Sequence, residues 1–207
     1  MLRENKCKMK HIVLHVLLFL SVALSCAAIC PSLADGRALS GNPEVKTVID
    51  RAFSFERLTA SYRMVRTVPV ISDRLESSGS LELCSDGSLR WHCESPDEYV
   101  FYTDGDSAHV EKDGKKMAVP QSFSSIYSMI SDSRDNLWES RMFSILTHEM
   151  DGGRIGLEIL PSRGVLSSFI SKIDMVVSIA EAVVTEIDII ASNGSVTRIV
   201  FSDVSKL

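Results

Sequence analysis

The middle of this 207-residue chain consists of short apolar-rich runs separated by turn dipeptides, and that pattern leaves few folds open. Each dipeptide joins one run to the next without room for a crossover helix, which parallel strands would need. The pattern therefore predicts an antiparallel meander. Its strands are Ser80–Cys84, Ser88–Glu94, Glu98–Thr103 and Ser107–Lys112, and its turns contain Asp86-Gly87, Ser95-Pro96, Asp104-Gly105 and Asp113-Gly114.

The first hairpin of this meander is specific enough for its register to be predicted. A three-residue loop over 85–87, with Gly87 in the left-handed conformation, places the large apolar side chains on one face. A two-residue loop would scatter them over both faces, so the three-residue loop is favoured. The opposite pairs are then Leu83 with Leu89, Leu81 with Trp91, and Glu82 with Arg90.

Two cysteines, Cys84 and Cys93, belong to this hairpin, while the other three lie within the first 30 residues. In the predicted register they point to opposite faces and are separated along the ladder. A disulfide needs Cα atoms within about 7 Å of each other. We therefore expect two free thiols.

The rest of the chain contains one clear helix and more strands. Asn42-Pro43 predicts a helix start, because Asn caps free N–H groups and Pro suits the first helical position. Apolar residues then recur at helical spacing to Phe53, and the period changes to two from Leu58 to Met64, as in a strand. Four later strands are predicted at Arg154–Leu160, Phe169–Ser178, Ala182–Ile190 and Ser195–Phe201, with Asn193-Gly194 as a turn rather than a glycosylation sequon.

The stretch Gln121–Leu146 interrupts the strands with helical apolar spacing. Serines occupy much of the opposite face of its first half, and serine is a mediocre helix former. We therefore expect a first helix that depends on its apolar face, followed by a second one. The apolar residues are Phe123, Ile126, Tyr127, Met129 and Ile130 in the first, and Leu137, Trp138, Met142, Phe143 and Leu146 in the second.

The N-terminus has the pattern of a secretory signal peptide. Basic residues between Arg3 and Lys10 precede the apolar run Ile12–Ile29. Ser32-Leu33-Ala34 predicts cleavage after Ala34, and Ser25-Cys26-Ala27 is an earlier alternative. An uncleaved membrane anchor and lipidation at Cys26 stay open as further interpretations. We predict a signal peptide over 1–34 and a single domain over 35–207.

Charge and motifs exclude several classes of function. The net charge of -5 becomes -8 without residues 1–34, which argues against nucleic acid and anionic membrane surfaces as partners. His92, His109 and His148 do not form a zinc-ligand motif, and no G-x-S-x-G elbow occurs. Asp104-Gly105-Asp106 is interpreted as a hairpin turn rather than a calcium loop. The sequence predicts no catalytic residue, metal or cofactor.

Four segments together resemble the periplasmic outer-membrane lipoprotein carrier family, LolA. They are LTASYRM (58–64), GSLEL (79–83), LRWHCESPDE (89–98) and YTDG (102–105). Three departures accompany them. Met64 stands where the family often has Gln, Ser85 stands where many members carry a basic residue that holds a lid closed, and the chain ends before the C-terminal extension of larger members.

The resemblance implies an α+β fold: an incomplete antiparallel β-barrel covered by α-helices and enclosing an apolar cavity. It implies a periplasmic carrier, monomeric and not an enzyme, that takes acylated lipoproteins from an inner-membrane releasing complex to an outer-membrane acceptor. The lid would be the 121–146 helices, with Phe123, Ile126, Tyr127, Met129, Ile130, Trp138 and Phe143. The lipid-binding cavity would be lined by Leu58, Tyr62, Met64, Leu81, Leu83, Leu89 and Trp91. Val100 and Tyr102 are added to this set, although Tyr99 and Phe101 on the same strand are also apolar and alternation there does not select a face.

Other interpretations of the same features stay open. The apolar strand residues could be ordinary core. The fold could serve a membrane-anchored lipoprotein receptor, if Cys26 is lipidated, or a regulatory module that senses a lipid or protein. An enzyme acting on a lipid or envelope substrate would have to use His92, His109 or His148.

Overall fold

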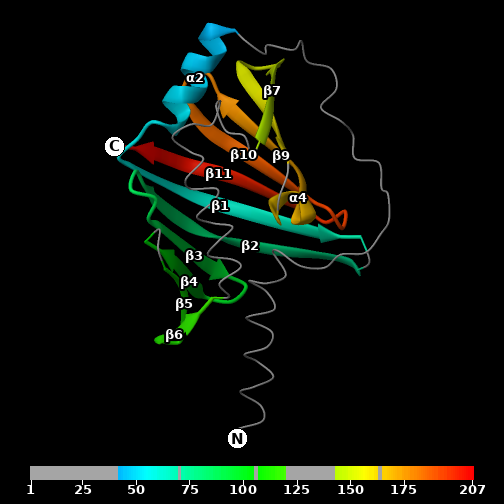
Figure 1. Ribbon diagram of the computed structural model, residues 1–207. Coiled ribbons are helices and arrows are strands. Elements are labelled where there is room, and N and C mark those ends of the chain that lie inside the picture. Colours follow the sequence, from blue (N-terminus) through cyan, green and yellow to red (C-terminus); the bar gives the residue numbers. More distant parts are fainter. Residues whose placement is uncertain (1–41, 70, 105–106, 120–142, 163–164) are drawn as a thin grey trace, which may run out of the picture.

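The computed structural model of the protein describes residues 42–69, 71–104, 107–119, 143–162 and 165–207. Within them, eleven strands form one antiparallel sheet, drawn in Figure 1. The strands are β1 (Arg57–Val68), β2 (Ile71–Cys84), β3 (Leu89–Ser95), β4 (Tyr99–Thr103), β5 (Ala108–Lys112), β6 (Lys115–Ala118), β7 (Phe143–Met150), β8 (Arg154–Pro161), β9 (Ile170–Ser178), β10 (Val183–Ala191) and β11 (Val196–Lys206). The described helices are α2 (Pro43–Phe53) and α4 (Val165–Phe169).

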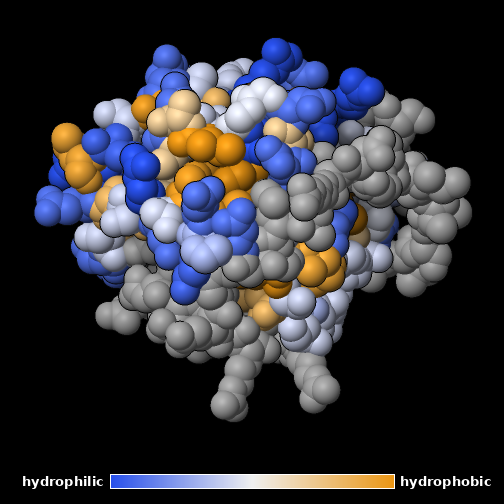
Figure 2. All heavy atoms as spheres, turned by 90° about the horizontal axis from the view of Figure 1, so that it is seen from above, coloured by the Kyte–Doolittle hydropathy of each residue, from blue (hydrophilic) through white to orange (hydrophobic). Residues whose placement is uncertain are grey.

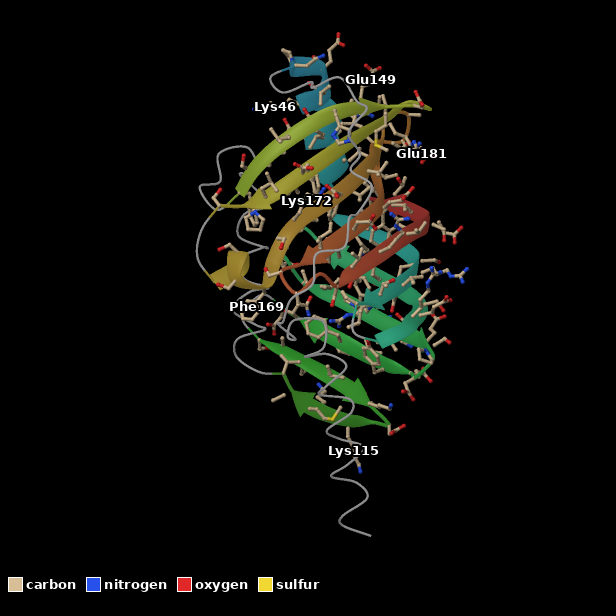
Figure 3. The ribbon with its side chains drawn as sticks, turned by 90° about the vertical axis from the view of Figure 1, so that its right-hand side faces the viewer. Lys46, Lys115, Glu149, Phe169, Lys172 and Glu181 are labelled. Atoms are coloured by element: carbon tan, nitrogen blue, oxygen red, sulfur yellow. The ribbon has the colours of Figure 1, made fainter. Side chains whose placement is uncertain are left out.

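The sheet is curved and unclosed. Its order is β6-β5-β4-β3-β2-β1-β11-β10-β9-β8-β7, so the first and last strands of the chain pair at its centre. Lys115 on β6 and Glu149 on β7 lie at its two ends in Figure 3. These findings confirm the predicted curved antiparallel sheet. Helical covering beyond α2 and an enclosed apolar cavity stay predictions.

Helix α2 begins as the sequence predicts. The Asn42 side chain accepts a hydrogen bond from the Glu44 N–H at 2.9 Å, and Pro43 occupies the first helical position. Its apolar stripe, Val45, Ile49 and Ala52, is buried against Ile155, Leu157, Ile159 and Ile173 of β8 and β9. The exposed helix face carries charged side chains such as Lys46, which points away from the sheet in Figure 3.

The predicted hairpin register is confirmed. Leu83 pairs with Leu89, Leu81 with Trp91, and Glu82 with Arg90. The Cys84 N–H donates to the Ser88 carbonyl at 2.9 Å, which closes a loop of three residues. Gly87 has φ 88°, and Cys84 and Cys93 are free thiols.

Two further turn predictions are also confirmed. Asn193-Gly194 turns the chain between β10 and β11, with Gly194 at φ 79° and the Asn193 side chain accepting from the Ser195 N–H at 2.9 Å. The Asp104 carboxylate accepts from the Ser107 N–H at 2.8 Å between β4 and β5, so this residue stabilises a turn. Local side-chain-to-backbone bonds of this kind explain why turns can be predicted from sequence.

The predicted second helix is wrong over its last residues. Phe143 and Leu146 belong to strand β7, which pairs with β8 from Phe143 opposite Pro161 to Met150 opposite Arg154. Ile145 faces Ile159 and joins the cluster under α2, whereas Leu146 is 46% exposed on the other face. Pairing with an apolar neighbouring strand outweighs helical spacing here, because it satisfies the backbone and buries alternate residues. Leu137, Trp138 and Met142, with the whole first helix, lie outside the described residues.

One face of the sheet is largely apolar from β8 to β5, and we call it the inner face. Opposite pairs link Leu157, Met175, Ile187, Ile199 and Met64 in one row across β8, β9, β10, β11 and β1. A second row links Ala60, Leu81, Trp91, Phe101 and Val110 across β1 to β5. Helix α2 lies on this face at the β8–β9 end. Figure 2 looks down on the α2 and β7 end, where hydrophobic residues are exposed at the surface between hydrophilic ones.

The outer face is charged over the same strands. Lys172 lies between Glu158 at 3.2 Å and Asp174 at 2.9 Å, and Arg198 pairs with Asp188. Burial raises the pKa of the Asp174 carboxyl, and Lys172 partly opposes this shift. Within the described residues, the inner face is therefore the more apolar of the two faces.

Candidate functional site: the inner face of β1 to β4

Seven of the predicted cavity residues share the inner face. Tyr62, Met64 and Leu81 are buried, with Tyr62 only 3% exposed, and Leu58, Leu83, Leu89 and Trp91 are half-buried. The Tyr62 and Trp91 rings lie 4.4 Å apart between centroids at an angle of 42°. Tyr62, Met64 and Ile199 form a cluster with Trp91, Ile187 and Phe201. That these residues line a lipid-binding cavity stays a prediction.

The remaining two, Val100 and Tyr102, point the other way. Val100 pairs with His92 and Tyr102 with Arg90, both on the outer face. Their neighbours Tyr99 and Phe101 take the inner positions, opposite Cys93 and Trp91. The β4 run is apolar at both parities, so its orientation depends on pairing with β3.

A glycine allows β2 and β3 to approach closely beside the inner-face cluster. Gly79 lies opposite Tyr62 on one side and Cys93 on the other, at an irregularity in the β2–β3 register. A Cβ atom there would lie 1.9 Å from the His92 carbonyl oxygen. Only glycine allows β2 and β3 to approach so closely at this point.

A cavity of about 280 Å³ opens beside this cluster, towards the β3–β4 turn. Met64 is the only one of the nine predicted cavity residues that lines it. Its inner-face lining comes from β1, β2, β3 and β4, and charged residues surround its mouth. The lining residues are Met64, Arg66, Arg74, Leu75, Glu76, Ser77, Cys93, Pro96, Asp97 and Tyr99.

The cavity region is poorly solvated. Burial raises the pKa of the Tyr62 and Tyr99 hydroxyls and of the Cys93 thiol, because each charged form would lose its hydration. Burial also lowers the pKa of the Arg66 guanidinium. All four shifts have desolvation as their largest cause, so burial favours the neutral form of each of these groups.

Sequence reasoning missed Arg66, Ser77, Cys93 and Tyr99 as cavity residues. The signal for Arg66 was available: it continues the alternation of Tyr62 and Met64 along β1, which the structure extends to Val68. The alternation described from the sequence runs from Leu58 to Met64, so Arg66 lies beyond the predicted strand. Ser77 lies opposite Met64 on a part of β2 that the sequence did not predict as strand.

The three histidines lie on three different strands. His92 approaches Glu98 at 3.3 Å, His109 stacks on Tyr102 at 5.1 Å, and His148 lies against Gly156 on the neighbouring strand. Within the described parts of the chain, no three His, Cys, Asp or Glu side chains are grouped as metal ligands.

The two thiols should differ strongly in reactivity. Cys93 is 1% exposed and burial raises its pKa, whereas Cys84 is half-buried at the end of β2. Because the thiolate is the reactive form, iodoacetamide at pH 8 should modify Cys93 at least about tenfold more slowly than Cys84. Peptide mass spectrometry over time measures both rates. In denaturant the two cysteines should react at equal rates, which is the control. Equal rates under native conditions would contradict the buried position of Cys93.

Three solved structures to which the chain is similar can now be compared with it. A LolA superfamily protein from Nitrosomonas europaea is 9% identical with a TM-score of 0.44, over 78% of this chain and 93% of that one. The lipoprotein LppX from Mycobacterium tuberculosis is 11% identical with a TM-score of 0.43, over 77% and 91%. A DUF1329 family protein from Desulfovibrio piger is 14% identical with a TM-score of 0.40, over 79% and 93%.

The first of these structures is described as a LolA superfamily protein, the family that the strand motifs resemble. No protein-family model and no curated protein matches the sequence. Among the residues that the structure describes, neither helix has the length and apolar content needed to span a membrane.

Proposed function

We propose that this protein is a non-enzymatic periplasmic carrier, which binds the acyl chains of lipoproteins on its inner face and takes them from the inner to the outer membrane. The observation that carries the proposal is the extent of the apolar inner face. This face continues from β8 across β1 to β5. Of the described helices, α2 packs on it, and it does so at the β8–β9 end. The predicted export signal and the acidic charge fit a soluble carrier between two membranes.

The physical need for a carrier is a matter of free energy. Moving a methylene group from an apolar environment into water costs about 0.8 kcal/mol, so a chain of about 15 methylenes faces roughly 12 kcal/mol. A carrier must cover that surface and still release it. Adaptable side chains such as Met64 suit this task, because methionine is flexible and polarizable.

The predicted lid belongs to this proposal. Phe123, Ile126, Tyr127, Met129 and Ile130 would cover bound acyl chains from a helix of low intrinsic stability, which could swing away. With Ser85 in place of a basic latch, apolar contacts would hold it closed. Trp138 would complete the lid, whereas Phe143 is part of the sheet. The proposed partners are acylated lipoproteins, an inner-membrane releasing complex and an outer-membrane acceptor.

The direct test is to purify the protein from its native envelope and identify bound lipid by native mass spectrometry. A carrier should emerge with acylated cargo, and the N-terminus in the same spectrum should lack residues 1–34. A lipid on Cys26 would instead indicate a membrane-anchored receptor. A protein partner without any lipid would indicate a sensing module.

A matched pair of variants tests whether the inner face binds acyl chains. Met64 and Val65 are neighbours on β1 that point to opposite faces, inward and outward. Met64→Gln should weaken saturable binding of a fatty acid about tenfold, because a buried amide without a partner costs about 1–3 kcal/mol. Val65→Gln should leave the Kd within about twofold. Equal effects of the two substitutions in a fluorescence titration would exclude this face as the binding surface.

A further inference from the structure

The cavity beside Met64 lies along the part of β2 that continues beyond the end of β3. Strand β3 pairs with β2 as far as Ser78, whereas β2 continues along β1 to Ile71. Within the described residues, no strand pairs with the β3 side of β2 over 71–77. Four consecutive residues, 74–77, line the cavity, although successive side chains of a strand point to opposite faces. The cavity therefore runs along the edge of β2, where a strand presents backbone N–H and C=O groups.

The Ser77 hydroxyl is a hydrogen-bond donor inside this cavity. It lines the cavity and is buried without a hydrogen-bond partner among the described residues. Ser77 lies opposite Met64 on β1, so it shares the inner face with that side chain. A buried hydroxyl without a partner is uncommon, and its O–H can be donated to an acceptor on a ligand.

The charged residues of the cavity wall are compensated or exposed to solvent. Arg66 has an interaction partner within the protein. Glu76 and Asp97 each form an ion pair, at 3.0 Å and 3.4 Å, and their side chains are exposed at the rim together with Arg74. The acceptor that would satisfy Ser77 therefore does not need to be charged.

The uncharged part of the wall favours an apolar ligand. The Cys93 thiol donates to the Ser95 carbonyl oxygen at 3.3 Å, and the Tyr99 hydroxyl interacts with the same thiol. Met64 and Leu75 add aliphatic surface. The interior thus offers a hydroxyl donor on β2 among largely apolar neighbours, which suits a neutral oxygen acceptor attached to a hydrocarbon chain.

We propose that this cavity binds the carbonyl group of an ester- or amide-linked acyl chain. The Ser77 O–H donates to the carbonyl oxygen. The chain extends past Met64 towards Tyr62 and Trp91, which belong to one apolar cluster. This role of Ser77 rests on the proposed function, and it makes the protein prefer acyl chains to alkyl chains of the same length.

The size of this preference follows from the strength of one hydrogen bond. An ether-linked alkyl chain has the same methylene groups but no carbonyl oxygen, so it leaves the Ser77 hydroxyl without that acceptor. A neutral hydrogen bond of this kind corresponds to about three- to tenfold in Kd. The acyl chain should be preferred by that factor.

Calorimetric titration with two lysophospholipids, below their critical micelle concentrations, tests this proposal. Lauroyl lysophosphatidylcholine and its dodecyl ether analogue share the head group and the chain length and differ in the carbonyl. The wild-type protein should bind the ester about three- to tenfold more tightly than the ether. Ser77→Ala should raise the Kd of the ester to that of the ether and leave the Kd of the ether within about twofold.

Ser78 provides the matched control for this substitution. It follows Ser77 on β2, opposite Arg63, and points to the other face. Ser78→Ala should leave both dissociation constants within about twofold. The melting temperature of Ser77→Ala should not fall below that of the wild-type protein, because its hydroxyl has no partner among the described residues to lose. Glycerophosphocholine, the head group alone, should not bind at millimolar concentration.

The outcomes separate carbonyl recognition from the proposed function. Equal affinity of the wild-type protein for ester and ether overturns carbonyl recognition and leaves the acyl-chain carrier intact. Glycerophosphocholine binding as tightly as the ester overturns it in favour of a head-group site. An equal loss of ester affinity in Ser77→Ala and Ser78→Ala excludes Ser77 as the donor. Binding of neither lipid overturns both proposals.

Discussion

Replacing Gly79 by alanine is expected to lower the free energy of unfolding by about 3 kcal/mol. The added Cβ would lie 1.9 Å from the His92 carbonyl oxygen and 2.9 Å from its carbon. Both are backbone atoms of β3, so no side-chain rotation relieves the contact and the strands must separate. Urea denaturation followed by tryptophan fluorescence measures the loss.

Gly114 provides the control for this substitution. It lies in the β5–β6 turn at φ 68°, and a Cβ there would meet no atom within 4 Å. Gly114→Ala should therefore cost only about 1 kcal/mol, from backbone strain alone. Similar losses at the two positions would mean that β2 and β3 do not approach closely at Gly79. Because Gly79 faces Tyr62, separated strands should also weaken lipid binding on the inner face.

Replacing Ile49 by alanine is expected to cost about 2–5 kcal/mol, because it removes a fully buried side chain and leaves a cavity. Ile49 is 0% exposed in the middle of α2 and packs with Leu157, also 0% exposed, in the cluster between helix and sheet. The loss should appear as a lower melting temperature by calorimetry. Since short helices depend on such packing, α2 should detach before the sheet unfolds.

Lys46 is the matched position on the exposed face of the same helix. Lys46→Ala should change the free energy of unfolding by less than about 0.5 kcal/mol, since it removes no buried surface and alanine favours the helix. Hydrogen exchange should show loss of α2 protection in the Ile49 variant alone. If α2 stayed as protected as in the wild-type protein, the helix would not depend on this anchor.

The correct predictions concern features that neighbours in sequence can establish. Asn42 caps the helix that begins at the next residue, by accepting a hydrogen bond from the Glu44 N–H. Gly87 and Gly194 adopt positive φ angles, which a residue without a Cβ can do at little cost. Once the loop over 85–87 has three residues, alternation places Leu81 and Trp91 on one face. Local hydrogen bonds and side-chain period suffice for each of these.

The errors occur where a distant strand supplies the missing information. The segment from Phe143 has helical spacing but pairs with β8, and Val100 and Tyr102 are outward because β3 sets the parity of an all-apolar β4. Only three residues of the predicted cavity wall are buried, and a single one lines the cavity that the structure describes.

Turns, the α2 start and the faces of the first hairpin thus follow from the chain's own local chemistry. The burial of Arg66 beside Ser77 and Leu75 does not, because alternation along β1 gives the face on which Arg66 lies but not the strands that surround it. Its position depends on β2 and β11 closing around β1, and β11 lies more than 120 residues further along the chain. Contacts of that range are formed by assembly of the sheet, where burial of apolar rows outweighs the preference of a single polar residue for water.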